Sequence, residues 1–178
     1  MTASAAPIPR VTLILGGARS GKSRRAESLI RACDPPWTYL ATATAGDAEM
    51  AERIARHRAD RGDGWRSVED PVDLPGTLAK LAAEPDAAVL VDCLTLWTGN
   101  LMGAGRDPEA ARAELCRVLA VTRGHTVLVA NEVGLGIVPD NAMARAFRDA
   151  AGRLNQDVAA LADRVVFVAA GLPMTLKG

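Results

Sequence analysis

The stretch GGARSGKS, residues 16–23, most constrains what this chain can fold into. It fits the pattern Gly-x-x-x-x-Gly-Lys-Ser/Thr of a phosphate-binding loop (P-loop), which joins a buried strand to the start of a helix. Its glycines let backbone N–H groups turn toward phosphate oxygens, and the start of the helix adds partial positive charge. A chance glycine-rich turn is the alternative. The apolar run VTLIL (11–15) before the motif and the helical pattern after it favour the P-loop.

The P-loop predicts a nucleotide site with defined roles for two side chains. Lys22, one of only three lysines in the chain, can reach the β- and γ-phosphates, and the Ser23 hydroxyl can bind Mg²⁺. We therefore expect Lys22 to be catalytic and Ser23 to be a metal ligand. The predicted nucleotide-binding residues of the loop are Gly16, Gly17, Ala18, Arg19, Ser20, Gly21, Lys22 and Ser23.

Short apolar runs alternate with helical patterns along the chain. Runs with the length and β-branched content of buried strands lie at 11–15, 37–43, 87–92, 126–130 and 164–170, and helical patterns lie at 23–33, 47–61, 72–84, 107–123 and 140–163. This alternation predicts an α/β fold of the P-loop NTPase type (RecA-like), with a mostly parallel sheet and helices on both faces. The expected loops are 44–47, 62–71, 98–107 and 131–140.

The pattern at 140–163 predicts the longest helix of the chain. Its apolar residues recur at spacings of three and four, so we expect one helix face to lie in the core. Asp140, just after Pro139, is the expected N-cap. The predicted core residues of this helix are Met143, Phe147, Leu154, Val158 and Leu161.

Length and composition limit the classes of protein to which the chain can belong. Its 178 residues suit one domain over 11–178, after a loose leader at 1–10. A net charge of zero gives no basic field for nucleic acid. No apolar stretch reaches the roughly 20 residues of a membrane-spanning helix. The three cysteines lack Cys-x-x-Cys spacing, which favours reduced thiols and a cytoplasmic protein over disulfides or a zinc site.

Acidic residues follow two of the predicted strands. Asp92 ends the run AAVLVD, where it can hold Mg²⁺ beside a P-loop or, alternatively, cap a turn. Asn131 and Glu132 follow the strand at 126–130. They form either a polar pair at the ligand-binding edge of the sheet or the start of a loop in which Gly134 and Gly136 are turn residues. Both interpretations of the pair stay open.

One of the two histidines, His57, stands among the arginines of ERIARHRADR (52–61). Helical spacing alone favours a partly packed side chain on the face shared with Met50 and Ile54. Alternatively, nearby guanidinium groups favour a neutral imidazole, which can attack phosphorus while the arginines hold the phosphates. The other histidine, His125, precedes a strand, and we interpret it as structural.

Six segments carry a resemblance that covers the chain from about Val11 to Lys177. In order, they are GGARSGKSRRAE, YLATA, EMAERIARHRADRGDGW, LVDCLTLW, NEVGLGIVP and FRDAAGRLNQDVAALADRV. Together they resemble the bifunctional adenosylcobinamide kinase/adenosylcobinamide-phosphate guanylyltransferase family of cobalamin biosynthesis. The P-loop is common to many families, whereas the Arg-Ile-x-x-His helix and NEVGLGIVP are specific to this one.

The resemblance implies two reactions and their substrates. ATP or GTP phosphorylates the hydroxyl of adenosylcobinamide; GTP then guanylylates a histidine, and the corrinoid phosphate takes up the GMP. The GMP-bearing histidine of the family corresponds to His57. Besides the P-loop, the implied nucleotide contacts are Ala41, Thr42, Ala43, Arg58, Ala59, Asp60, Arg61, Glu69 and Asp92, with Mg²⁺ on Ser23 and Asp92. Glu69 is expected to bind guanine.

The same resemblance implies a homo-oligomer, such as a trimer, in which the 47–61 helix reaches the P-loop of its own subunit or of a neighbour. Two other functions remain as alternatives. One is a different P-loop kinase for a small molecule, with His57 only packed. The other is a binding protein that hydrolyses nucleotide to change shape.

Overall fold

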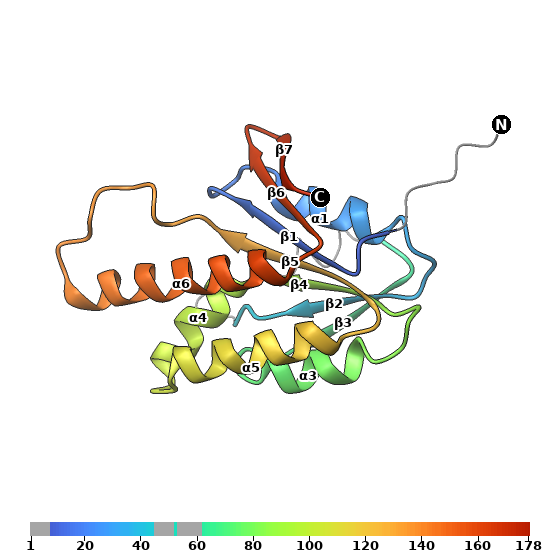
Figure 1. Cartoon of the computed structure of the whole chain (residues 1–178), viewed down its shortest axis with the longest axis horizontal. Coiled ribbons are helices and arrows are strands. Elements are labelled where there is room, and N and C mark those ends of the chain that lie inside the picture. The colour runs from blue at the N-terminus through green and yellow to red at the C-terminus, as the bar shows by residue number, and fades with distance from the viewer. Residues whose placement is uncertain (1–7, 45–51, 53–61) are drawn as a thin grey trace.

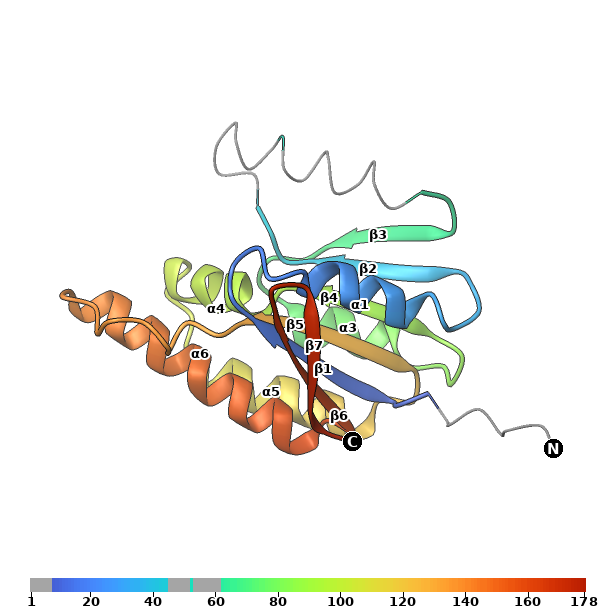
Figure 2. The ribbon, with the colours of Figure 1, turned by 90° about the horizontal axis from the view of Figure 1, so that it is seen from above.

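The computed structural model describes residues 8–44, 52 and 62–178. Within them, seven strands form one sheet in the order β3-β2-β4-β5-β1-β6-β7 (Figures 1 and 2). Neighbouring strands are parallel except β6 and β7. The strands are β1 (Val11–Gly16), β2 (Trp37–Ala41), β3 (Trp65–Glu69), β4 (Ala88–Asp92), β5 (His125–Asn131), β6 (Arg164–Ala169) and β7 (Leu172–Lys177).

Helices cover both faces of the sheet. The helices in the described residues are α1 (Lys22–Ile30), α3 (Leu74–Leu81), α4 (Leu94–Gly103), α5 (Pro108–Val121) and α6 (Ala142–Leu161). Helix α1 lies on one face, and the other four lie on the opposite face (Figure 1). Successive side chains of a strand point to opposite faces, so Ile14 packs with Ala26 and Ile30 of α1, whereas Leu13 and Leu15 join the other core. The predicted fold class is confirmed.

The predicted strands and most predicted helices occur near their expected positions. The runs at 11–15, 37–43, 87–92, 126–130 and 164–170 overlap β1, β2, β4, β5 and β6, and four of the five helical patterns overlap α1, α3, α5 and α6. The helix predicted at 47–61 lies outside the described residues except for Glu52, and the loop predicted at 44–47 does so except for Thr44.

Three elements differ from the sequence prediction. Strand β3 lies in the expected loop 62–71, because at the edge of the sheet its side chains are largely exposed and give no apolar signal. Helix α4 extends into the expected loop 98–107, where Gly99, Asn100 and Gly103 resemble loop residues. Strand β7 was not predicted. It pairs with β6 through a turn at Ala170 and Gly171, both of which have positive φ, as a tight hairpin requires.

The prediction for the long helix α6 was partly wrong. Leu154 and Val158 are buried as expected, but Met143 is 74% exposed and Leu161 is 37% exposed. The first turn of α6 extends beyond the core, so the apolar spacing continues there without burial. The N-cap is Asn141 instead of Asp140, because the Asn141 side chain accepts a hydrogen bond from the N–H of Ala144 at 2.8 Å.

The start of the chain is only partly described. Residues 1–7 of the expected leader lie outside the described residues. Arg10 donates to the carbonyl oxygens of Leu119 and Thr122 at 2.8 and 2.9 Å, which attaches the end of the leader to α5. Among the helices described, none combines the length and apolar character needed to cross a membrane.

Candidate nucleotide site

The P-loop leads from the buried end of β1 into α1, and its backbone requires glycine at two positions. A Cβ at Gly16 would lie 2.5 Å from the carbonyl oxygen of Val168 and 2.6 Å from Oγ of Ser20. Gly21 has a φ of +97°, and a Cβ there would lie 3.3 Å from Cα of Gly171. L-residues rarely adopt such a φ. The local geometry therefore explains the glycines at these two positions of the motif.

Hydrogen bonds hold the loop against its neighbours. The N–H of Ser20 donates to the carbonyl of Gly17 at 3.3 Å, and the N–H of Gly171 in the β6–β7 turn donates to the carbonyl of Ser20 at 2.8 Å. Nζ of Lys22 donates to the Gly17 carbonyl at 3.0 Å, so the lysine side chain folds back over the loop. The strand β7, which sequence reasoning missed, thus supports the P-loop through its turn.

The strand order brings other predicted site residues to the same edge of the sheet. In the strand register Gly16 is opposite Asn131, and Asp92 is opposite Ala41, which in turn is opposite Glu69. The carboxyl ends of parallel strands form the usual ligand crevice of such sheets. The sheet therefore lines up the ends of β3, β2, β4, β5 and β1 along one edge.

Asp92 is half-buried at the end of β4, and its Oδ2 accepts a hydrogen bond from the Tyr39 hydroxyl at 3.0 Å. Burial raises the pKa of the adjacent Cys93 thiol to about 11; the Asp92 carboxylate adds to this rise, and the Lys22 ammonium opposes it. The charges of Asp92 and Lys22 therefore both act near the end of β4. This agrees with a polar site between β4 and the P-loop.

The residues present fit a magnesium ion held largely by its substrate. Mg²⁺ prefers oxygen ligands and usually takes one or two carboxylates, with water and phosphate oxygens completing its shell. Ser23 in the first turn of α1 and Asp92 offer a hydroxyl and a carboxylate. In the described ranges, no group of three or more His, Cys, Asp or Glu residues forms a metal cluster. All three cysteines are free thiols.

Thr42 has a structural role that the sequence did not reveal. Its fully buried Oγ1 donates to the Cys93 carbonyl and accepts from the Cys93 N–H, both at 2.8 Å. Its own N–H donates to the Asp92 carbonyl at 3.2 Å, and its carbonyl accepts from Nδ2 of Asn100 at 2.7 Å. The Thr42 side chain is thus committed to holding the corner between β4 and α4. The predicted nucleotide contacts of 41–43 stay a prediction.

Asn131 and Glu132 lie beside the P-loop. The N–H of Glu132 donates to the carbonyl of Gly16 at 3.2 Å, and the N–H of Asn131 donates to Oγ1 of Thr95 at 2.7 Å. Oε1 of Glu132 accepts from the N–H of Gly134 at 2.6 Å, so this pair also begins a turn. The two interpretations of the sequence are therefore compatible. The buried Oδ1 of Asn131 has no hydrogen-bond partner within the described part of the chain.

Aromatic rings that sequence reasoning did not single out pack β3 against β2, starting from the amino-terminal ends of both strands. Trp65 of β3 packs against Trp37 and Tyr39 of β2, with ring centroids 5.6 and 6.2 Å apart. The guanidinium of Arg31 lies 5.3 Å from the Trp37 ring centroid and 5.6 Å from that of Trp65. These contacts hold the start of β3 against the sheet. Glu69, at the carboxyl end of β3, is exposed.

The remaining predicted site residues fall into two groups. His57, Arg58, Ala59, Asp60 and Arg61 lie outside the described residues, so their roles stay predictions. His125 starts β5 at the end away from the P-loop, and its Nδ1 lies 3.2 Å from the carbonyl oxygen of Pro9. That contact agrees with a structural histidine.

Comparison with known proteins identifies close relatives over nearly the whole chain. A profile of the family described as cobinamide kinase/cobinamide phosphate guanyltransferase matches residues 12–176. The bifunctional adenosylcobalamin biosynthesis protein CobP of Pseudomonas aeruginosa is 49% identical over 169 residues, covering 93% of this chain and 96% of the relative. The corresponding protein CobU of Salmonella typhimurium is 43% identical, covering 93% of this chain and 98% of the relative.

Solved structures of more distant proteins share the fold. The flagellar accessory protein FlaH of Methanocaldococcus jannaschii has a TM-score of 0.53 at 12% identity, covering 97% of this chain and 81% of that protein. An ATPase of a bacterial type III secretion system has a TM-score of 0.54 at 14% identity, covering 93% of this chain and 56% of that protein. The fold is thus that of P-loop ATPases. With the family profile and two relatives above 40% identity, this chain belongs to the cobinamide kinase/cobinamide phosphate guanyltransferase family.

Proposed function

We propose that this chain is a bifunctional enzyme of cobalamin biosynthesis that phosphorylates adenosylcobinamide and then converts the phosphate to adenosylcobinamide-GDP. The observation that carries the proposal is the likeness, over 93% of the chain, to relatives named as bifunctional adenosylcobalamin biosynthesis proteins. The complete P-loop supports it, because both reactions need a nucleoside triphosphate held by its phosphates.

In the first reaction, the hydroxyl oxygen of adenosylcobinamide attacks the γ-phosphorus of ATP or GTP. The bond from the γ-phosphorus to the β,γ-bridging oxygen breaks, the nucleoside diphosphate leaves, and the hydroxyl proton passes to a base. The P-loop N–H groups and Lys22 stabilise the charge that moves onto the phosphate oxygens. Mg²⁺ on Ser23 and Asp92 would neutralise further charge on the triphosphate.

In the second reaction, a neutral nitrogen of His57 attacks the α-phosphorus of GTP, and pyrophosphate leaves. A phosphate oxygen of the corrinoid then attacks the phosphorus of the GMP-histidine, which forms the diphosphate bond and frees the imidazole. Covalent catalysis of this kind divides a difficult transfer between two large substrates into two simpler displacements. Arg58 and Arg61 would bind phosphates, and Glu69 would accept hydrogen bonds from the guanine N1–H and amino group.

We further propose that the enzyme acts in the cytoplasm as a homo-oligomer, without nucleic acid. Exposed apolar side chains support association, because contiguous apolar surface often marks an interface. One group lies in the 133–138 loop and the start of α6, and the other lies on β7. The exposed residues are Leu135, Ile137, Val138, Met143, Leu172, Met174 and Leu176.

Incubation of the full chain with adenosylcobinamide, ATP and Mg²⁺, followed by addition of GTP, tests the proposed function. Mass spectrometry should detect adenosylcobinamide phosphate first, and adenosylcobinamide-GDP with pyrophosphate after GTP is added. Hydrolysis of nucleotide with the corrinoid unchanged would contradict the proposal and favour a nucleotide-hydrolysing binding protein. Phosphorylation confined to a different small molecule would favour another P-loop kinase.

A further inference from the structure

We infer that Glu132 is the general base of the phosphorylation step and accepts the proton of the acceptor hydroxyl. This inference rests on the proposed function, because it requires a hydroxyl that attacks the γ-phosphorus. An oxygen nucleophile becomes stronger as it loses its proton, and a positioned carboxylate is a common acceptor. The position of Glu132 in the sheet, its hydrogen bonds and its unpaired charge carry the inference.

The strand order restricts which carboxylate can serve the P-loop. Glu69, Asp92 and Glu132 stand at the carboxyl ends of β3, β4 and β5, and β5 is the neighbour of β1. Neighbouring strands lie about 4.8 Å apart, so β4 lies about 10 Å and β3 about 19 Å from β1. Asp92 also accepts the hydrogen bond from Tyr39 and is the proposed magnesium ligand. Glu132 is therefore the carboxylate of these three that lies nearest to the P-loop strand.

Hydrogen bonds fix Glu132 in this position at both its backbone and its side chain. Its N–H donates to the carbonyl of Gly16, the first residue of the P-loop, at 3.2 Å. Its Oε1 accepts from the N–H of Gly134 at 2.6 Å, and a Cβ at Gly134 would lie 2.9 Å from the same oxygen. Glycine at 134 thus leaves room for the carboxylate. A base held in this way needs little rearrangement when the acceptor arrives.

The charge of Glu132 is not neutralised by a basic side chain within the described ranges, where the ion pairs involve other carboxylates. Glu109, by comparison, is paired with both Arg112 and Arg153. Glu132 is half-buried, so part of the residue remains accessible. Its carboxylate is therefore available to take a proton.

The proposed step balances its atoms and charges. The hydroxyl proton moves to a carboxylate oxygen of Glu132 while the hydroxyl oxygen forms its bond to the γ-phosphorus. The bond to the β,γ-bridging oxygen breaks, and the nucleoside diphosphate carries away the electron pair. The carboxylic acid then returns its proton to solvent after the products leave. Guanylyl transfer to the corrinoid phosphate requires no such base, because the attacking phosphate oxygen is already ionised.

Glu132→Gln tests this role, because the glutamine oxygen can still accept from the Gly134 N–H and keep the turn. We expect kcat for phosphorylation of adenosylcobinamide by ATP to fall by about 10²–10⁴-fold, the usual contribution of a general base. The KM for ATP should stay close to that of wild type. In the same preparation, conversion of adenosylcobinamide phosphate and GTP to adenosylcobinamide-GDP should continue at a normal rate. The matched control is Glu114→Gln, at an exposed position on α5, which should leave both reactions unchanged.

The pH dependence distinguishes a base from a structural residue. The pH profile of wild-type kcat for phosphorylation should differ from that of Glu132→Gln, because only the wild-type side chain can accept the proton of the hydroxyl. Near-normal phosphorylation by the variant would overturn the inference. Equal loss of both reactions with a lower melting temperature would overturn it as well, since it would indicate support of the P-loop only. Wild-type protein that leaves adenosylcobinamide unmodified would instead overturn the proposed function, and the role of Glu132 with it.

Discussion

Lys22 is the residue on which both proposed reactions depend. Its ammonium group already lies over the P-loop, bonded to the Gly17 carbonyl at 3.0 Å, and a bound phosphate would replace that acceptor. One positioned donor of this kind contributes about 2.7–4 kcal/mol to the transition state, so Lys22→Ala should slow both steps by about 10²–10³-fold. Steady-state rates of phosphorylation and of guanylyl transfer measure the effect.

The control for Lys22 is Lys80→Ala, because Lys80 is exposed in the last turn of α3, which leads to the amino-terminal end of β4 and not to the carboxyl edge of the sheet. That variant should keep both activities. Near-normal guanylyl transfer by Lys22→Ala would contradict the expectation of a shared phosphate site and would limit the P-loop to the kinase step.

Glu69 and Asp70 are adjacent carboxylates with different surroundings. Asp70 accepts from the N–H groups of Val72 and Asp73 and from the Thr77 hydroxyl, so it stabilises the turn before α3. Glu69 is exposed at the end of β3. We expect Glu69→Gln to weaken the preference for GTP over ATP in nucleotidyl transfer, because glutamine cannot accept from both guanine N–H donors as a carboxylate does.

Competition between GTP and ATP in the guanylyl transfer assay measures that preference. Discrimination equal to that of wild type would remove Glu69 from base recognition. Asp70→Asn is a useful comparison, since it should lower the melting temperature without changing the choice of base.

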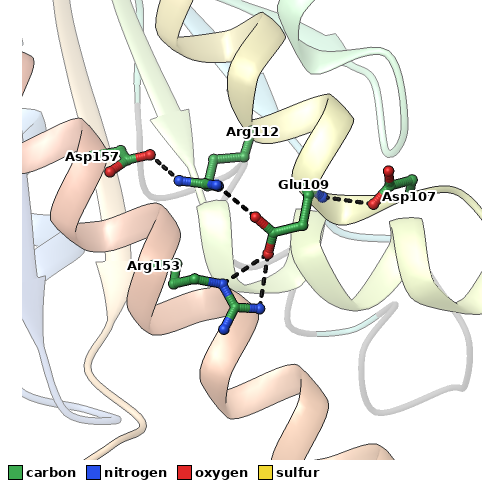
Figure 3. Close-up of polar contacts among 5 residues, drawn as sticks. All are labelled: Asp107, Glu109, Arg112, Arg153 and Asp157. Carbon is green, nitrogen blue, oxygen red and sulfur yellow. Dashed lines mark hydrogen bonds and ion pairs between the residues drawn. The ribbon is translucent and has the colours of Figure 1, made fainter.

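At the scale of elements, an ion-pair cluster joins α5 to α6 (Figure 3). Glu109 of α5 accepts from Arg112 at 2.5 Å and from Arg153 of α6 at 2.8 Å, and Arg112 also pairs with Asp157. Hydrogen bonds from Arg153, and then those from Arg112, hold the pKa of the Glu109 carboxyl below its ordinary value of 4.5. The cluster therefore connects two helices on the same face of the sheet.

Glu109→Gln should lower the free energy of unfolding at pH 7 by less than about 1 kcal/mol, because the pairs are partly exposed and screened by water. The folded-state pKa is lowered, so this stabilisation is present above the carboxyl's ordinary pKa and is lost as pH falls below about 4.5. Urea unfolding at pH 7 and at pH 3.5 measures the free energy of unfolding of wild type and variant. The difference between the two proteins should be smaller at pH 3.5 than at pH 7. A difference that stayed constant over this range would exclude the charge of Glu109 as its source; Glu114→Gln on the same helix is the control.

The sequence predicted those elements whose burial leaves a continuous apolar run. Strands β1, β4 and β5 are central and covered on both faces, so almost every side chain is apolar. Strand β7 has no buried residue, so it leaves no apolar run. Helix α4 contains glycine and asparagine, whose contacts are with distant parts of the chain. For example, a Cβ added at Gly99 of α4 would lie 3.7 Å from the ring of Phe147 in α6. Such contacts join distant segments and leave no local pattern.

The residues of the candidate site likewise differ in whether the sequence alone indicates them. The sequence singles out the P-loop and Asp92, because phosphate and Mg²⁺ require those residue types after a strand, and the sheet places both at its carboxyl edge. Their roles as ligands stay predictions. The structural roles of Thr42 and Asn100 could not be predicted, because each depends on hydrogen bonds across more than 50 residues of chain. The register that brings Glu132 beside Gly16 likewise exists only in the folded sheet.

For the whole molecule, one P-loop has to serve two attacks on different phosphorus atoms. The hydroxyl of adenosylcobinamide must reach the γ-phosphorus, and His57 must reach the α-phosphorus. The proposed phosphate site lies at the end of β1, and carboxylates lie along the same edge of the sheet. His57 therefore has to approach that edge, and the covalent GMP-histidine is the central claim of the proposed mechanism.

Labelling of wild type and His57→Ala with α-³²P-GTP and Mg²⁺ tests that claim most directly. Wild-type protein should retain an acid-labile, base-stable label on a denaturing gel, as expected for a phosphorus–nitrogen bond. The variant should carry no label and make no adenosylcobinamide-GDP, yet should still phosphorylate adenosylcobinamide with ATP and melt at the wild-type temperature. Retained label in His57→Ala would contradict the account, and so would equal loss of both activities with a lower melting temperature, as a packed histidine predicts.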